Sequence, residues 1–370
     1  MWQVTPDDLE LIAIGAGILG TGGGGNPYLG QQHMTRLLQQ GYQATVISLD
    51  EIADDALVTE VSGMGAPTVG VEKLPRGDEP RWAVEALEQF IGRPIDALVC
   101  AEVGGVNSIT PLVAGALTGK PVLDADGMGR AFPELQMSTH FFNGVPCTPA
   151  ALVDEKGNRI VFAHTVDAFT LERFARDLCV AMGCIAELAM PVMTGRQVKA
   201  HSVRNTLSLA RRIGDAVRAA RATKAPVVDA VLAVTGGVAL FSGKLVDVQR
   251  QTRGGFARGQ LVAEGSGADR GTWLHIAFQN ENLVAWRGRR HTPEEVLASV
   301  PDLICVVESD SGEPITTEQL RYGLRVTVLA VPCSDKLRTP QALAVVGPAA
   351  FGYPDVTYVP LPKQPGQGIE

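Results

Sequence analysis

Residues 95–101 read Ile-Asp-Ala-Leu-Val-Cys-Ala (IDALVCA), a short and almost wholly apolar run that decides the fold class. Such a run is typical of a strand that is buried on both faces of a parallel sheet. Helix-like segments lie on either side of it, at residues 79–91 and 109–117. The other strand-like segments in this part are residues 42–49, 56–61 and 121–124. This alternation predicts an α/β N-terminal domain.

The start of the chain carries a misleading motif. Residues 11–20 (LIAIGAGILG) show the spacing GxGxxG, which binds dinucleotides where a strand precedes it and a long helix begins within it. Here Thr5, Pro6 and Asp8 form a helix start, so residues 6–19 are predicted to be a helix themselves. The glycines that follow would end that helix at once. We therefore predict no dinucleotide site, and a second helix over residues 27–40.

The second half of the chain has a different pattern. A hairpin is expected at residues 150–163, then a helix at 170–182, a strand at 184–190 and a long helix at 197–222. After Pro226 short strand-like runs dominate, which is typical of a β-barrel or sandwich. These runs are residues 245–248, 259–264, 273–278, 283–287, 303–309 and 324–331. We predict a two-domain α+β protein, with an α/β domain over residues 1–168 and, over residues 169–370, a domain that is helical to 223 and then β-rich.

Composition narrows the classes of function. The 370 residues carry a net charge of −8 and no basic stretch, which argues against binding to nucleic acid. No apolar run approaches the roughly 18 residues of a membrane helix, and the first residues lack a signal-peptide pattern. The six cysteines show no CxxC spacing, which indicates reduced thiols in a cytoplasmic protein. A homodimer is compatible with the exposed strand edges of a β-rich domain.

Four glycines in a row follow the first helix, and they form the first candidate site. Gly22, Gly23, Gly24 and Gly25 allow a tight loop whose N–H groups converge, and Asn26 then starts the second helix. Such a loop can bind an anion or an oxyanion, so all five residues are candidates for substrate binding. The alternative is a simple turn between two helices.

Glu102 and Asn107 follow the buried strand 95–101, at its carboxyl end. In open α/β sheets this edge is where ligands bind. Glu102 is therefore a candidate catalytic carboxylate, and Asn107 is a candidate for substrate binding. Asn107 can alternatively cap the next helix.

Residues 124–134 (DADGMGRAFPE) form the third candidate. Asp124 and Asp126 lie two apart at a strand end, so both side chains are expected on one side. The pair could orient a water or, together with Glu102, hold a divalent metal. Arg130 could bind an anionic group of a substrate. The alternative is an aspartate-rich turn.

His140 and Cys147 form the fourth candidate. They lie seven positions apart, so a loop could bring the imidazole and the thiol together as an acid and a nucleophile. A buried, inert thiol and a structural histidine are the alternatives. The remaining histidines show no spacing typical of a metal site.

Three long motifs carry a resemblance to a known family. Residues 20–30 (GTGGGGNPYLG), 101–111 (AEVGGVNSITP) and 121–137 (PVLDADGMGRAFPELQM) resemble the S-methyl-thiohydantoin desulfurase-like family, formerly domain of unknown function 917. Later segments, including LFSGKLVDVQRQTRGGFARG and GPAAFGY, are similar to its C-terminal domain. The resemblance implies an α/β domain followed by a β-rich one. Some members of the family are fused to hydantoinase or oxoprolinase domains, which implies cyclic amide or thioamide substrates.

The resemblance implies hydrolysis of a small ring, such as an S-methyl-thiohydantoin that loses methanethiol. On the residues, we expect Asp124 or Asp126 as the base for water and Glu102 as its partner or as the acid. His140 is a reserve acid and Cys147 a reserve nucleophile. The alternatives are an accessory subunit of a hydantoinase- or oxoprolinase-type system and a protein that binds a small molecule without turnover.

Overall fold

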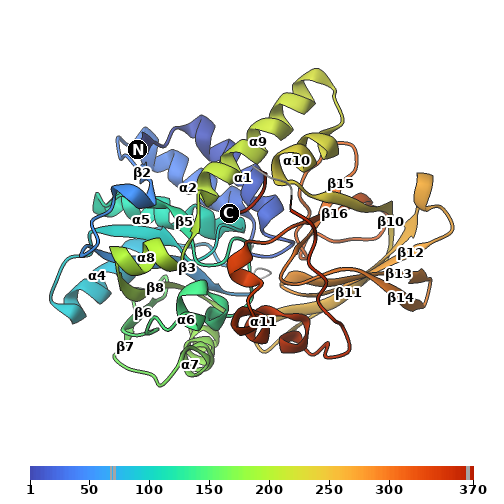
Figure 1. Cartoon of the computed structure of the whole chain (residues 1–370). Helices are drawn as coiled ribbons and strands as arrows, with labels where there is room; N and C mark the ends of the chain where they lie inside the picture. Colours follow the sequence, from blue (N-terminus) through green and yellow to red (C-terminus); the bar gives the residue numbers. More distant parts are fainter. Residues whose placement is uncertain (67–68, 70–71, 364–366) are drawn as a thin grey trace.

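A computed structural model describes residues 1–66, 69, 72–363 and 367–370 of the chain. Figure 1 shows an α/β part, coloured blue to green, beside a curled antiparallel sheet coloured yellow to red. The chain therefore has the predicted α/β N-terminal domain and β-rich C-terminal domain, and the β-rich part has the form of a half-barrel. Within the described ranges, no helix combines the length and the apolar composition needed to cross a membrane.

The first sheet has parallel strands at its centre. In the described residues its order is β1-β2-β5-β4-β3-β8-β6-β7, with β9 paired to β5. Strands β2, β5, β4 and β3 run parallel, whereas β8 pairs antiparallel with β3 although it lies far along the chain. The strands are β1 (Trp2–Gln3), β2 (Thr45–Ile47), β3 (Leu57–Gly65), β4 (Ala97–Cys100), β5 (Val122–Asp126), β6 (Ala150–Val153), β7 (Arg159–Phe162), β8 (Ile185–Thr194) and β9 (Val203–Arg204).

Helices cover this sheet and connect it to the second one. They are α1 (Pro6–Leu19), α2 (Pro27–Gln39), α4 (Glu79–Ile91), α5 (Thr110–Thr118), α6 (Thr139–Phe142), α7 (Ala168–Ala181), α8 (Gly195–His201), α9 (Thr206–Thr223), α10 (Val227–Thr235) and α11 (Pro340–Val346). The 3₁₀ turns are η1 (Leu49–Glu51), η2 (Gly105–Ser108), η3 (Leu135–Met137), η4 (Gly267–Asp269), η5 (Asp335–Leu337) and η6 (Pro348–Phe351). The predictions for α1, α2, α4 and the β6–β7 hairpin are confirmed.

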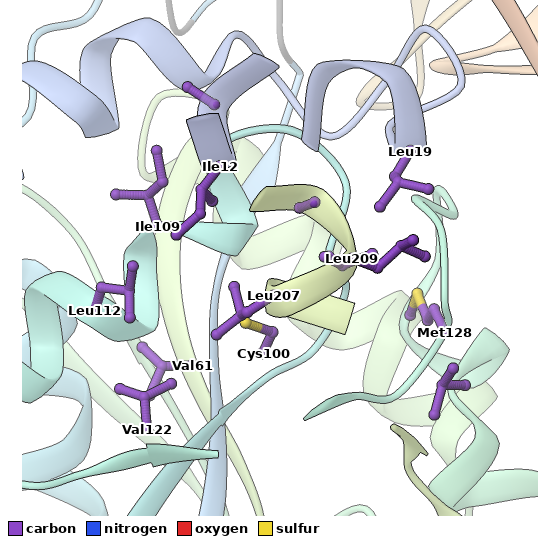
Figure 2. Close-up of a cluster of buried hydrophobic side chains, with 14 of the residues drawn as sticks. Ile12, Leu19, Val61, Cys100, Ile109, Leu112, Val122, Met128, Leu207 and Leu209 are labelled. Atoms are coloured by element: carbon purple, nitrogen blue, oxygen red, sulfur yellow. The ribbon is translucent and has the colours of Figure 1, made fainter. Parts of the chain in front are cut away.

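The glycines of the GxGxxG motif serve helix packing. They lie in or directly after α1, whose N-terminus has the predicted capping box. A Cβ on Gly15 would lie 1.9 Å from the Ala210 carbonyl oxygen of α9, and a Cβ on Gly214 would lie 2.0 Å from the Leu11 carbonyl oxygen. The two helices therefore approach as closely as their backbones allow. Figure 2 shows apolar side chains of α1 and α9 in one core with residues of the sheet, among them Ile12, Leu209 and Val122.

The second sheet is antiparallel throughout, in the order β14-β13-β12-β11-β10-β16-β15. Its strands are β10 (Val238–Arg253), β11 (Phe256–Gly265), β12 (Trp273–Gln279), β13 (Glu281–Arg289), β14 (Thr292–Ser299), β15 (Leu303–Glu308) and β16 (Arg325–Val331). The long strand β10 carries bulges in both of its pairings, and bulges increase the bend of a strand. This bending allows the sheet to curl around its own apolar core.

The prediction of a single helix over residues 197–222 is wrong. The segment divides into α8 and α9 at Ser202 to Asn205. Val203 and Arg204 pair with β5, and Asn205 takes a left-handed conformation with φ 58°. Pairing with the sheet outweighs the helical pattern at this point.

Other features extend or add to the predicted elements. Residues 63–65 lengthen β3 beyond the predicted strand 56–61, since they pair with β8. Helix α10 and strand β14 were not predicted, the latter because five of its eight residues are exposed. The end of the chain packs against the protein: Ile369 is buried, and the Glu370 carbonyl oxygen accepts from Ser334.

Candidate active site

A cavity of about 240 Å³ lies where the two sheets meet. Its walls come from the glycine loop after α1, the end of β3, the loop after β4, the segment 132–135 and the turn before β13. Apolar side chains form much of the wall. These include Leu29, Met64, Val106, Val113, Met128 and Phe132. A cavity that is mainly apolar and holds a few convergent polar groups is typical of a small-molecule site.

Glu102 and Glu281 bring carboxylates from the two domains into this cavity. Glu102 follows β4, as predicted, and both of its oxygens accept hydrogen bonds: Oε1 from Asn107 Nδ2 (2.7 Å) and Oε2 from the Phe132 amide (2.9 Å). Glu281 is the first residue of β13, and its Oε1 accepts from the Gly24 amide (3.2 Å). Its Oε2 is buried and has no hydrogen-bond partner among the described residues.

Burial makes both carboxyl groups weak acids. Desolvation raises the pKa of Glu102 to about 7, against the opposing effect of its two hydrogen bonds. Desolvation raises the pKa of Glu281 well above its usual value, and the nearby charge of Glu102 raises it further. The pair therefore does not carry two full negative charges at neutral pH, and one group can hold a proton while the other lacks it. This is the arrangement that acid–base catalysis requires.

The glycine loop is shaped by what packs around it. A Cβ on Gly23 would lie 1.9 Å from Glu281 Oε1, and a Cβ on Gly24 would lie 2.5 Å from the Gly104 carbonyl oxygen. Gly22, Gly24 and Gly25 also have positive φ angles, which other residues rarely adopt. Gly24 and Gly25 line the cavity, whereas the Gly24 amide already donates to Glu281. The loop thus brings the Glu281 carboxylate close to the N-terminal domain.

Asn26 and Asn107 both line the cavity. Asn26 caps α2 by accepting from the Tyr28 amide (2.9 Å). Asn107 accepts from the Gly63 amide (2.8 Å) through Oδ1 and donates to Glu102 through Nδ2. The Asn107 side chain therefore fixes the orientation of the Glu102 carboxylate.

Asp124 and Asp126 are buried but do not line the cavity in the described residues. Asp124 accepts from the amide and the hydroxyl of Ser208 on α9. Asp126 Oδ2 accepts from the amides of Val103 and Gly129 (2.8 Å each), and burial raises the pKa of its carboxyl well above the usual value. Asp126 thus joins the loop that carries Glu102 to the loop that follows β5.

Arg130 is fully buried and uses its guanidinium to join the two domains. It donates to the carbonyl oxygens of Ala131, Pro301, Asp302 and Asn282 and to the Thr21 hydroxyl. These bonds occupy all five of its N–H groups. No donor is left for an anionic substrate in this structure.

His140 and Cys147 do not meet. His140 Nδ1 lies 2.5 Å from Glu60 Oε1, and Nε2 lies 2.9 Å from Ser202 Oγ. The chain Ser202–His140–Glu60 has the order of a hydrolase triad, but its three side chains are at most 2% exposed and do not line the cavity. Cys147 Sγ contacts Thr165 Oγ1 at 3.3 Å. The histidine network thus joins β3, α6 and the break between α8 and α9.

A metal site on Glu102, Asp124 and Asp126 does not fit these positions. The three carboxylates have separate partners: Asn107 and a backbone amide, Ser208, and two backbone amides. In the part of the chain that the structure describes, no three His, Cys, Asp or Glu side chains are grouped to hold a metal ion.

Sequence reasoning missed several polar residues of the cavity, among them Glu281 and Glu187. Residues 279–281 (QNE) have a composition typical of a turn, and Glu187 lies in the predicted strand 184–190. The available signal was a glutamate at the start of, or inside, an otherwise apolar strand. Such a residue is costly to bury without a reason.

Comparisons with known proteins agree with this architecture. Residues 7–164 match the model of the S-Me-THD-like N-terminal domain, and residues 166–361 match that of the S-Me-THD-like C-terminal domain. The chain is similar to a protein from Chromobacterium violaceum of known crystal structure, with a TM-score of 0.81 and 26% sequence identity. That similarity covers 98% of this chain and 100% of the other. No curated protein matches the chain.

Proposed function

The chain belongs to the S-Me-THD-like family, and from this premise we propose that it hydrolyses the C–S bond of a small cyclic thioamide derivative such as an S-methyl-thiohydantoin. The observation that carries the proposal is the buried carboxyl pair, Glu102 and Glu281, in the cavity between the domains. The pair supplies an acid and a base to one site. The apolar walls suit a five-membered ring.

Hydrolysis requires attack by water on the ring carbon that is bonded to sulfur. Glu102 in its ionised form accepts a proton from the water as the C–O bond forms. Asn107 and the Phe132 amide hold its carboxylate in place. The electron pair of the C=N bond moves to the ring nitrogen, and a tetrahedral intermediate results in which one carbon carries the new oxygen and the old sulfur.

Collapse of the intermediate breaks the C–S bond. Glu281, whose pKa burial raises well above its usual value, donates a proton to the leaving sulfur through Oε2, the oxygen that has no partner among the described residues. The electron pair on the ring nitrogen re-forms the C=N bond as methanethiol leaves, and transfer of the hydroxyl proton to that nitrogen gives the hydantoin. Water is consumed, and transfer of the proton from Glu102 back to Glu281 restores the starting state.

The test is an assay of methanethiol release from an S-methyl-thiohydantoin. Glu102→Gln and Glu281→Gln should each lower kcat by about a hundredfold or more. Glu313→Gln, which changes an exposed glutamate paired with Arg221, is the matched control and should leave the rate unchanged. Asp124→Asn tests the alternative base: loss of activity in that variant, with activity kept in Glu281→Gln, would overturn the assignment.

Two outcomes lead to other functions. A wild-type protein that binds the ring but releases no thiol would be a binding protein. One that becomes active only with a hydantoinase- or oxoprolinase-type partner would be an accessory subunit. The proposal includes a cytoplasmic location, where the cysteine thiols stay reduced, and permits a homodimer.

A further inference from the structure

The cavity is lined by more acidic than basic side chains. Six glutamates face it among the described residues, against two basic side chains and one histidine. The glutamates are Glu79, Glu102, Glu134, Glu155, Glu187 and Glu281, and the others are Lys73, Arg176 and His33.

Both basic side chains are already paired with a glutamate. Lys73 Nζ donates to the carbonyl oxygens of Met182 (2.7 Å) and Ile185 (3.0 Å), and it pairs with Glu155 (2.6 Å). Arg176 pairs with Glu172 through Nε (2.7 Å) and donates to the Pro133 carbonyl oxygen through its second terminal nitrogen (2.9 Å). Burial lowers the pKa of His33, which favours its neutral form. An anionic ligand would therefore find little compensation for its charge.

Two of the glutamates have a buried carboxyl oxygen without a partner among the described residues. Glu281 is 2% exposed, and its Oε2 has no partner in the described part of the chain. The side chain of Glu187, which projects from β8, makes no hydrogen bond to any described residue, and its Oε2 is buried. Burial raises the pKa of Glu187 to about 8, and the charge of Glu79 adds to the effect. A buried carboxyl group without a partner is costly for folding, and a bound ligand could remove that cost.

The oxygens of two polar side chains lie close together at Gly63. A Cβ placed on Gly63 would lie 3.3 Å from Glu187 Oε1 and 3.4 Å from Asn107 Oδ1. Asn107 in turn donates to Glu102. The acceptors of Glu187 and the Glu102–Asn107 pair therefore face one region of the cavity.

We infer that the cavity selects a planar amidinium-type cation over an anionic ring, and that Glu187 determines this specificity. The inference rests on the proposed function for the identity of the reacting ring. In an S-methyl-thiohydantoin, the carbon bonded to sulfur also carries two nitrogens, as in an amidine. A proton held on a ring nitrogen by a cavity carboxylate makes that carbon more electrophilic towards water.

The test compares three five-membered rings of similar size in calorimetric binding at neutral pH. The probes are 2-aminoimidazoline (a cation without a C–S bond), hydantoin (neutral) and 5-oxoproline (an anion). Wild type should bind the cation at least tenfold more tightly than the anion. Glu187→Gln should weaken binding of the cation by about tenfold to a hundredfold, the range for a charged hydrogen bond, and leave hydantoin nearly unchanged. Glu313→Gln should bind like wild type.

Equal or tighter binding of 5-oxoproline by wild type would overturn the inference without use of any variant. An unchanged preference in folded Glu187→Gln would overturn the role of Glu187. These outcomes are distinguishable from failure of the proposed function, because 2-aminoimidazoline cannot release methanethiol. Thiol release without selectivity for the cation would support the proposed function and overturn this inference. Selectivity for the cation without thiol release would support this inference and overturn the proposed function.

Discussion

Gly23→Ala should disable the site by moving one carboxylate. The added Cβ would lie 1.9 Å from Glu281 Oε1 and 2.5 Å from its Cδ, whereas ordinary contact begins at 3.4 Å. The carboxylate must therefore move by 1.5 Å (3.4 less 1.9). The Gly23 backbone lies outside the left-handed region, so alanine adds no backbone strain there. A shift of this size is expected to cost about a hundredfold in kcat, with a stability loss of about 1–3 kcal/mol from overpacking.

The assay is a double-mutant cycle on methanethiol release and on urea unfolding. In a Glu281→Ala background the clash disappears, so Gly23→Ala should cost little further activity and little stability. Gly41→Ala is the control, since nothing lies within 4 Å of its added Cβ although its φ is 92°. It should lose stability and keep activity. Wild-type activity in Gly23→Ala, or fully additive losses in the double variant, would refute the reasoning.

Three further predictions concern the buried charges. Arg130→Met should lower the free energy of unfolding by about 3–5 kcal/mol, because it leaves buried carbonyl oxygens without their donor; a loss under about 1 kcal/mol in urea titrations would contradict this. The raised pKa of Glu187 means that the folded state holds an extra proton between the unfolded value of about 4.5 and about 8, so stability falls as pH rises through that window. Glu187→Gln should therefore raise the free energy of unfolding by more than about 1 kcal/mol at pH 9 and leave it unchanged at pH 4. Equal changes in the free energy of unfolding at the two pH values would contradict this prediction. Asp126→Asn should lower the free energy of unfolding by less than about 1 kcal/mol, since the neutral amide keeps the acceptor for the Val103 and Gly129 amides. Asp126→Ala should lower it by about 2–4 kcal/mol. The same urea titrations measure both variants, and equal losses would exclude a role of Asp126 as the acceptor for these amides.

Local signals in the sequence were sufficient to predict much of the first domain. Thr5, Pro6 and Asp8 predicted the start of α1, and the capping box is present in the structure. The apolar run at residues 95–101 predicted β4, and Glu102 at its end lies in the cavity. In each case the decisive interactions are between residues close in sequence, or follow from the polarity of a parallel sheet.

Long-range packing determines the features of the structure that local sequence signals could not predict. Glu281 reaches the glycine loop only because the second sheet docks against the first, and its partner Gly24 lies 257 positions away. The helical pattern of residues 197–222 gave no indication that Val203 and Arg204 would pair with β5. Arg130 looked available to a substrate, since its acceptors at residues 282, 301 and 302 belong to the other domain.

The most direct test of the account is methanethiol release from an S-methyl-thiohydantoin by wild type and by Glu281→Gln, measured side by side. The account predicts turnover by wild type. In the variant, with the fold intact, it predicts a rate that is lower by about a hundredfold or more. Equal rates in the two proteins would contradict the central role of the Glu102–Glu281 pair.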